Sequence, residues 1–468
     1  MIINIIVDNL VRIPISKLTE IQLNAIKQQF EYHNAQYYTL QAIGKKMPVY
    51  MKKIRSYSTS YDKNYLQLTR GTLPQLRELL DKWDLRYFIS DCRIKLEEQN
   101  WKLNPSLKLR SYNQRVINEL KQYENAILLA PPGSGKTKAM IGLMAEIKQP
   151  TLIMVHTGEI YKHWIKELNE CLIYDKPIGQ ITAGKYDIYP ITISTIQTLD
   201  HLGYRDYETL NKSFGMIIIS EVHHISAWTF HKVVNKLSAY YKFGETASAK
   251  RKDQKQILFY DTISHNIVEV TDQDMVKENV FMPAIVYPVH LIGFKYNFNN
   301  DFVNLVNELT LNETRNNIIA DLAVKDAQKH NVLILTGRKE HCKSLYEKIS
   351  EKVPCHFITS KKSNKQRDKI IKDIRDNKVK VLVATYSLIG EGANIPILDC
   401  LHLTTPSHNY ELLKQWTGRV RRVFGDKKNA VIRDFIDDDC EYLKHIGKKR
   451  IKFYEKMGLA VENVLDKN

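Results

Sequence analysis

Short apolar runs alternate with amphipathic stretches along the chain from about residue 107 onward. Four of these runs are β-branched or aliphatic, and they lie at 127–129, 151–155, 191–194 and 216–219. Runs of this length and composition are typical of parallel strands that are buried on both faces. Helical periodicity separates them, as in Ile160–Leu172, so the pattern predicts a doubly wound α/β lobe.

The alternation pauses and then returns. Residues 276–300 contain Pro283, Pro288 and Gly293, and we interpret this stretch as a crossing between lobes. Further apolar runs follow at 332–335, 379–383, 400–403 and 430–432. They predict a second lobe of similar design, so the expected fold class is α/β with two parallel-sheet lobes.

Residues 1–105 follow a different pattern. Strand-like segments at 50–55, at 65–69 and near Tyr87 surround a helical pattern at 73–83, and the apolar start of the chain is a further strand rather than a signal peptide. This predicts a small α+β module. The expected domains are therefore the N-terminal module at 1–105, the first lobe at 106–290, the second lobe at 291–440 and a C-terminal helix at 441–468.

The charge of the chain favours a polyanionic partner. Its 468 residues include 69 Lys or Arg and 52 Asp or Glu, a formal net charge of +17, although a merely basic protein explains charge alone equally well. In the N-terminal module, Lys52, Lys53 and Arg55 lie among tyrosines. Cations of this kind can meet phosphates while rings stack on bases, so we predict nucleic-acid contact here, with a solvated sheet face as the alternative.

The cysteines and the apolar runs indicate a reducing, membrane-free setting. The six cysteines form no CxxC pair and no cluster with zinc spacing, so we expect reduced core residues of an intracellular, cytoplasmic protein. No apolar run is long enough to cross a bilayer, so no membrane partner is expected. The basic triplet at 448–450 is interpreted either as a backbone contact or as a solvated helix face.

The sharpest chemical motif is APPGSGKT at 130–137, between a predicted strand and a predicted helix at 138–147. Its two glycines allow a tight turn whose N–H groups face phosphates, and the helix N-terminus points at the same anion. Lys136 is predicted to reach the β and γ phosphates of ATP, and Thr137 to hold Mg²⁺. The predicted ATP-binding residues of this loop are Pro132, Gly133, Ser134, Gly135, Lys136 and Thr137.

A second motif, SEVHH at 220–224, follows the apolar run at 216–219. Glu221 is placed to polarise the attacking water, and His224 to link the ATP site to neighbouring loops. Ser220 stands where a metal-orienting Asp is expected, and a hydroxyl brings no negative charge. The expected Mg²⁺ set is Thr137, Ser220 and Glu221. We hypothesise that Ser220→Asp preserves or raises ATPase activity.

Together these motifs resemble superfamily 2 helicases over about 107–440, which implies two RecA-like lobes and an ATP-driven motor. Gln114 resembles the upstream glutamine that reads adenine, and Tyr112 is then placed to stack on the base. Asn113 between them leaves a register shifted by one residue open. The run FGETAS at 243–248 resembles the Phe-Gly-Leu-Thr-Ala-Thr-Pro run of the family, which contains its coupling motif.

Other positions correspond to loops that touch the nucleic-acid backbone or ATP. The resemblance implies backbone contacts at the strand-end residues Thr157, Thr195, Gln197, Thr336, Arg338 and Thr385. The run EGANIP at 391–396 is similar to an EGxDxP loop and assigns Gly392 to the ATP site. The run QWTGRVRR at 415–422 matches QxxGRxxR. Arg419 and Arg422, one helical turn apart, would face the γ-phosphate beside Gln415 and act as arginine fingers when ATP closes the lobes.

Within the superfamily, the segment 221–230 resembles the set that contains XPB-like helicases, restriction-enzyme translocases and phage branch-migration helicases. The resemblance implies a monomeric, ATP- and Mg²⁺-dependent DNA helicase that unwinds or branch-migrates forked and junction DNA in replication, recombination and repair, in the cytoplasm of an infected bacterium. Two alternatives stay open. An RNA helicase is one, because backbone contacts hardly separate DNA from RNA. A clamp that binds ATP but barely hydrolyses it, as Ser220 suggests, is the other.

Overall fold

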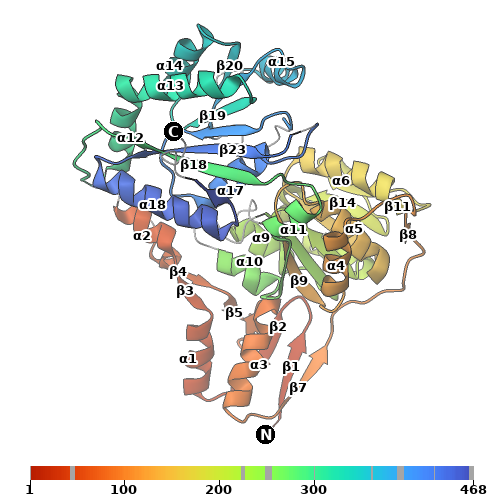
Figure 1. The fold of residues 1–468 in the computed structure, drawn as a ribbon. Coiled ribbons are helices and arrows are strands. Elements are labelled where there is room, and N and C mark those ends of the chain that lie inside the picture. Colours follow the sequence, from red (N-terminus) through yellow and green to blue (C-terminus); the bar gives the residue numbers. More distant parts are fainter. Residues whose placement is uncertain are drawn as a thin grey trace. The chain divides into compact units, whose positions relative to one another are not determined.

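The computed structural model describes residues 2–42, 48–222, 227–247, 256–299, 301–359, 362–386, 395–425 and 427–462. The chain divides into two compact units, Met1–Val270 and Thr271–Asn468, and each contains a parallel sheet with helices packed on it (Figure 1). The predicted α/β class with two RecA-like lobes is confirmed. Among the described helices, none has the length and apolarity that crossing a membrane requires.

The main sheet of the first unit has eight strands in the order β13-β12-β14-β10-β15-β16-β9-β17. Only β13 runs antiparallel to its neighbour. The four apolar runs predicted as strands are β9, β10, β14 and β15. The strands are β9 (Asn125–Leu129), β10 (Thr151–Val155), β12 (Gly179–Thr182), β13 (Lys185–Asp187), β14 (Ile191–Thr195), β15 (Met216–Ile219), β16 (Tyr241–Thr246) and β17 (Ile267–Glu269).

Helices cover this sheet and bury its apolar side chains. The apolar core includes Leu152, Ile217 and Phe230, which pack together from β10, β15 and α9. A small two-stranded sheet is formed by β8 (Lys102–Leu103) and β11 (Leu172–Ile173). The helices are α4 (Ser111–Leu120), α5 (Lys136–Ile147), α6 (Gly158–Cys171), α7 (Ile196–Asp200), α8 (Tyr204–Ser213), α9 (Ala227–Val234) and α10 (Gln256–Thr262).

The N-terminal residues form a separate five-stranded sheet in the order β5-β6-β2-β1-β7. Apolar residues of β1, β2 and β6 pack against α1 and α3 and form a core of their own, so the predicted α+β character is confirmed. A two-stranded ribbon of β3 and β4 lies between β2 and β5 in the chain. The elements are β1 (Ile3–Val7), β2 (Val11–Pro14), α1 (Glu20–Gln29), β3 (Glu31–His33), α2 (Ala35–Ala42), β4 (Lys53–Arg55), β5 (Tyr57–Thr59), β6 (Tyr65–Leu68), α3 (Leu73–Lys82) and β7 (Tyr87–Asp91).

Arg70 joins this N-terminal sheet to the first lobe. Its side chain is 3% exposed, and its guanidinium donates to the carbonyls of Ala239 and Tyr240 and to Asn125 Oδ1. Next to it, the backbone of Gly71 lies so close to α10 that a β-carbon there would be 2.2 Å from the carbonyl oxygen of Tyr260. The N-terminal module is therefore part of the first compact unit, and the predicted boundary at 105/106 does not separate compact units.

Arg70→Ala is expected to destabilise the first unit by about 3 kcal/mol, because it leaves buried acceptors without their donor. The free energy of unfolding in urea would measure this. Arg77 is exposed on α3 and provides the matched control. Arg77→Ala is expected to change the stability by less than about 0.5 kcal/mol. Equal effects of the two substitutions would contradict the anchoring role of Arg70.

The second unit contains a sheet of seven parallel strands in the order β20-β21-β19-β22-β23-β18-β24. The predicted runs in this lobe correspond to β19, β21, β22 and the start of β23. The strands are β18 (Ala284–Leu291), β19 (Val332–Thr336), β20 (Cys355–Ile358), β21 (Val381–Thr385), β22 (Cys400–Leu403), β23 (Ala430–Asp437) and β24 (Ala460–Val461). The helices are α11 (Asp272–Lys277), α12 (Phe302–Leu311), α13 (Glu313–Ala327), α14 (Lys339–Ser350), α15 (Asn364–Arg375), α17 (Tyr410–Val420) and α18 (Glu441–Lys456).

The stretch interpreted as a crossing between lobes contains strand β18. It pairs with β23 along its whole length, and Pro288 lies opposite Asp434. On its other side, within the described residues up to 462, β24 pairs with Ile285 and Val286. Among these residues the proline therefore lies beyond the part of β18 with strands on both sides, which is where a strand tolerates a missing N–H. Because β18 belongs to the second sheet and the units divide after Val270, the predicted boundary at 290/291 falls too late.

The C-terminal helix α18 is an integral part of the second lobe. Arg450 is buried and donates two hydrogen bonds to the carboxylate of Asp434, at 2.8 and 2.7 Å, and the hydroxyl of Tyr454 donates to the same carboxylate. Of the basic triplet, only Lys448 and Lys449 are exposed. Arg450 is therefore a core residue and neither a backbone contact nor part of a solvated face.

The cysteines mostly follow the prediction. All six are free, and five of them are buried. Cys92 is exposed, at the end of the N-terminal sheet, so the expectation of a core residue is wrong for this one.

Candidate ATP site and nucleic-acid interface

The loop between β9 and α5 has the geometry of a phosphate cradle. Gly133 and Gly135 both have φ of +83°, in the left-handed region that residues with a side chain seldom adopt. Helix α5 begins at Lys136, two residues earlier than predicted, so its N-terminus follows the second of these glycines directly. The free N–H groups of the first helical turn therefore lie at the end of the loop, where an anion is favoured.

Lys136 connects this loop to the second motif. Its Nζ lies 3.3 Å from Glu221 Oε1 and also donates to the carbonyl of Ala130 at 3.4 Å. Glu221 has φ of +50°, an uncommon backbone conformation for a residue with a side chain. Conformations of this kind cluster at functional sites. The fold thus brings together the amine and the carboxylate that were predicted to act on ATP and water.

The Ser220 side chain is hydrogen-bonded to a second acidic residue, Glu245. Its Oγ donates to Glu245 Oε1 at 2.6 Å, and both side chains are buried. Burial raises the pKa of Glu245 to about 7; the charge of Lys136 opposes this rise and that of Glu221 adds to it. Sequence reasoning missed Glu245. The available signal was an acid within the apolar run FGETAS, at the position where the similar family run has leucine.

Tyr112 braces the phosphate loop. It is 3% exposed, and its hydroxyl donates to the carbonyl of Ser134 at 2.8 Å. Arg110 adds a contact from the same helix end, because its guanidinium donates to Tyr112 Oη at 3.1 Å and to the carbonyl of Gly133 at 3.4 Å. The prediction that the Tyr112 ring stacks on adenine is therefore wrong, since a buried ring offers no free face to a base.

The two candidate residues at the start of α4 lie in different surroundings. A β-carbon on Gly135 would lie 3.0 Å from Asn113 Nδ2, and Asn113 is 3% exposed. Gln114 is exposed, and its amide donates to Asn118 Oδ1 one turn further along the helix. Asn113 is thus the residue that lies next to the loop, and the reading of adenine by Gln114 stays a prediction.

The predicted backbone contacts of the first lobe lie at one edge of its sheet. Val155 pairs in register with Thr195, so the ends of β10 and β14 are adjacent. Thr157 and Thr195 cap the N-termini of α6 and α7, and Gln197 donates to the carbonyl of His156 at 3.1 Å. Loops at the carboxyl ends of parallel strands form the ligand-binding edge of such sheets.

The predicted backbone-contact residues of the second lobe, Thr336, Arg338 and Thr385, are less exposed to a nucleic-acid strand. Thr336 is fully buried and hydrogen-bonds His341 Nδ1 at 2.7 Å, and Thr385 is 6% exposed. Contact of these two side chains with a nucleic-acid backbone is contradicted by their burial. Arg338 is half-buried and donates to Asn307 Oδ1 at 2.7 Å. Its guanidinium is anchored to the segment that holds α12.

The arginine motif lies at the end of α17, which stops at Val420. Arg422 is therefore beyond the helix, and its backbone bridges to Phe281 instead of continuing the turn that carries Arg419. The two guanidiniums are nevertheless close. Burial lowers the pKa of Arg419 to about 10, and the charge of Arg422 adds to the effect.

Arg421, between the two, has a structural role. It is 2% exposed, and its Nη1 lies 2.6 Å from Asp272 Oδ2. Gln415 is half-buried on the same helix, and its functional assignment stays a prediction.

A basic pocket of about 480 Å³ lies in the first unit between the N-terminal strands and α9. Lys53 and Arg55, predicted from sequence, contribute to it, and both pair with Glu31. Lys232 and Lys236, which sequence reasoning missed, line its other side. Lys52 is exposed and does not line it; its amine lies 6.0 Å from the centre of the Tyr38 ring.

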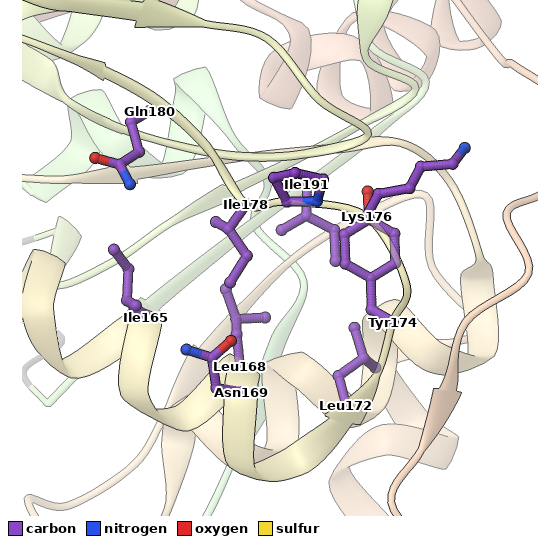
Figure 2. A pocket seen from close by; sticks show the side chains of 10 residues that line it. Ile165, Leu168, Asn169, Leu172, Tyr174, Lys176, Ile178, Gln180 and Ile191 are labelled. Carbon is purple, nitrogen blue, oxygen red and sulfur yellow. The ribbon is translucent and has the colours of Figure 1, made fainter.

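A second pocket, of about 400 Å³, lies away from these residues (Figure 2). Leu168 and Ile165 of α6 line one side, and Ile178 and Gln180 line the facing side. None of the predicted site residues contributes to it. It gives no indication of a ligand for the predicted motor.

One buried group in the second lobe has the composition of a metal site. Asp326, Cys400 and His402 hold their ligand atoms within 4.8 Å of one another. However, Arg433 Nη2 donates to Asp326 Oδ1 at 2.7 Å. Burial alone would raise the pKa of Asp326, but its bonds from Arg433 and His402 outweigh burial and hold it well below the usual range. The carboxylate already has its cation, so we interpret the group as an ion-pair cluster.

Several predicted residues lie outside the described part of the chain. They are His224 of the second motif, Ser248 of the coupling motif, and Gly392 with its neighbours Glu391 and Asn394.

Comparisons with known proteins agree with this assembly of motifs. Residues 106–251 match the family described as type III restriction enzyme, res subunit, and residues 314–424 match the helicase conserved C-terminal domain. The two matches fall on the two parallel-sheet lobes.

Individual relatives extend over most of the chain. It is 30% identical over 362 residues to the probable helicase D10 of Escherichia phage T5, covering 77% of this chain and 77% of that protein. It is 22% identical over 397 residues to the DNA 3′-5′ translocase XPB2 of Sulfurisphaera tokodaii, covering 75% of this chain and 88% of that protein. The crystal structure of T4 UvsW aligns over 99% of this chain and 100% of that chain, with a TM-score of 0.46 and 20% identity.

Two lobes that match helicase models, a phosphate loop joined to its acidic partner and a phage relative of this similarity agree with the resemblance that the motifs suggested. The chain is therefore an ATP-dependent helicase of superfamily 2 and belongs to the family of the phage T5 helicase.

Proposed function

We propose that this helicase acts on DNA, and that it unwinds or branch-migrates forked and four-way-junction DNA during replication, recombination and repair. The observation that carries the proposal is the contact of Lys136 with Glu221 on the same sheet edge as the strand-end residues Thr157, Thr195 and Gln197. A motor needs its hydrolysis groups and its grip on the strand mechanically connected, and a shared sheet edge connects them.

Each ATP-site residue has a distinct proposed role. Lys136 neutralises the β and γ phosphates, and Glu221 accepts the proton of the attacking water. Arg419 and Arg422 stabilise the charge that develops on the transferred phosphoryl group.

The donor set of the first lobe also fits a hard cation. Ser134 Oγ and Glu245 Oε2 are buried oxygens without a hydrogen-bond partner among the described residues, and oxygen ligands suit Mg²⁺. We propose that Thr137, Ser220 and Glu221 hold the ion, which would neutralise phosphate charge when bound.

An unwinding assay on fork, four-way junction and plain duplex, with and without ATP, tests the proposed substrate. We expect ATP-dependent unwinding with preference for the branched substrates. We expect the protein to sediment as a monomer, and we propose that it acts in the cytoplasm of an infected bacterium. The name of the XPB2 relative supports DNA. Stronger stimulation of ATP hydrolysis by RNA than by DNA would replace this proposal with an RNA helicase, and binding without turnover would replace it with a clamp.

The basic pocket between the N-terminal strands and α9 provides a prediction for DNA binding. Replacing Lys232 and Lys236 together by glutamine should weaken DNA binding and lower the slope of log affinity against log salt by about 2, because two phosphate contacts are lost. Fluorescence anisotropy at several salt concentrations measures both quantities. Lys166→Gln, on the exposed face of α6, is the control and should leave the slope unchanged. An unaltered slope in the double variant would exclude this pocket from the DNA path.

A further inference from the structure

The first position of the second motif lacks the negative charge expected there, and a neighbouring strand provides one. Ser220 stands where a metal-orienting Asp is expected, and its hydroxyl is neutral. The carboxylate that meets it is that of Glu245, whose Oε1 accepts a hydrogen bond from Ser220 Oγ at 2.6 Å. In the family run that resembles 243–248, the position of Glu245 is occupied by leucine. The chain thus carries an acid beside the very position from which an acid is missing.

The register of the sheet places Glu245 between the two ATP motifs. Strand β16 lies between β15 and β9, and Ile219 pairs with Gly244 while Leu128 pairs with Glu245. One residue further, the N–H of Ala130 donates to the carbonyl of Thr246 at 3.0 Å. Glu245 therefore lies on the strand between β9, which leads into the phosphate loop, and β15, which ends directly before Ser220.

The surroundings of Glu245 do not satisfy it as a structural residue. Its side chain is 2% exposed, and its Oε2 has no hydrogen-bond partner within the described part of the chain. Ser134 of the phosphate loop is 1% exposed, and its Oγ also has no hydrogen-bond partner among the described residues. Buried polar oxygens are normally hydrogen-bonded, and buried charges are paired or coordinate metals. A leucine here would pack without that cost, so the acid indicates a cation.

We propose that Glu245 supplies the carboxylate that orients nucleotide-bound Mg²⁺, directly or through a metal-bound water, in place of the aspartate that position 220 lacks. Ser220, proposed above as one of the residues that hold the ion, then contributes by holding Glu245 through its hydroxyl rather than by contacting the ion itself. This proposal rests on the proposed binding of ATP and Mg²⁺ by the first lobe and names the ligand that the motif itself does not contain.

Metal-dependent nucleotide binding tests the proposal without relying on turnover. The affinity of the full chain for a fluorescent ADP analogue is measured across a range of Mg²⁺ concentrations and in EDTA, and Mn²⁺ binding to the same complex is followed by electron paramagnetic resonance. Glu245→Gln keeps an oxygen that can accept from Ser220 and removes only the charge. We expect the half-saturating metal concentration to rise about 10- to 100-fold, with unchanged affinity in EDTA.

A relocation variant separates a metal ligand from a packing residue. Glu245→Leu should behave like Glu245→Gln, whereas Ser220→Asp combined with Glu245→Leu returns a carboxylate to the motif and should restore the metal requirement of the wild type. Ser220→Asp alone sets two carboxylates side by side, and their mutual repulsion should keep its metal affinity from exceeding that of the combined variant. Glu269→Gln, at the exposed end of β17, is the control for loss of an acid at this sheet edge.

The possible results discriminate the two proposals. A Glu245→Gln variant that binds Mn²⁺ as tightly as the wild type, or a combined variant that does not recover, overturns the role of Glu245 and leaves the ATP site intact. If the nucleotide affinity of the wild type does not change with Mg²⁺ concentration, the proposed Mg²⁺ function itself is overturned, before any variant is compared. Urea unfolding of each variant verifies that the compared proteins are folded.

Discussion

Replacing Lys136 by alanine is expected to lower ATP turnover by about 100- to 1,000-fold, because the substitution removes a preorganised cation from the phosphates. In the structure its amine is held by Glu221 and by the carbonyl of Ala130, so it is oriented by the phosphate loop and the second motif together. The loss should include nucleotide affinity, since the same charge acts on bound and reacting phosphates. Steady-state phosphate release with saturating forked DNA measures turnover, and equilibrium binding of a fluorescent ADP analogue measures affinity.

Lys138 provides the matched control for this prediction. It lies on the same helix, and its amine is 3.8 Å from Glu167 of α6, away from the loop. Lys138→Ala removes the same charge from the same turn of α5 and should leave turnover close to that of the wild type. If both variants lost activity equally, a general electrostatic effect of α5 would replace the specific role of Lys136.

Glu221→Gln is expected to reduce turnover by about 100- to 10,000-fold, the range for loss of a general base. The amide has the shape of the carboxylate but does not take a proton from water, so nucleotide binding should survive. This separates the two variants: Lys136→Ala loses binding and turnover, whereas Glu221→Gln loses turnover alone. A single-turnover measurement with prebound ATP isolates the chemical step from release of the products.

The left-handed backbone conformation of Glu221 allows a second prediction, which concerns the stability of its variants. A φ of +50° costs a residue with a side chain about 1 kcal/mol or more, so relief of that strain should be visible as added stability. Glu221→Gly is therefore expected to unfold at higher urea concentration than Glu221→Gln while being equally inactive. Substantial turnover in either variant would show that another group activates the water.

The local features of the chain were predictable because they depend on neighbours in sequence. A parallel strand buried on both faces must be apolar along most of its length, so β10, β15 and β19 are visible as apolar runs. The phosphate loop is equally local, since its turn needs glycines at fixed positions and its anion site is the start of the next helix. Strand β18 escaped prediction because the consequence of Pro288 depends on whether a partner strand requires its N–H.

Other properties depended on which face of an element the tertiary structure buries. Asn113 and Gln114 are adjacent in sequence, and only the packing of α4 decides which of them lies against the phosphate loop. Thr336 and Thr385 end their strands as expected, yet both side chains are buried.

The sequence alone therefore determined that this protein has two parallel-sheet lobes and where its phosphate loop lies, because hydrophobic periodicity and loop chemistry act over a few residues. The tertiary structure alone decided that Arg70 joins the N-terminal sheet to the first lobe and that Glu245 meets Ser220. Both contacts join residues from different strands or domains, and the distance between such residues is set by sheet order and packing rather than by their separation along the chain.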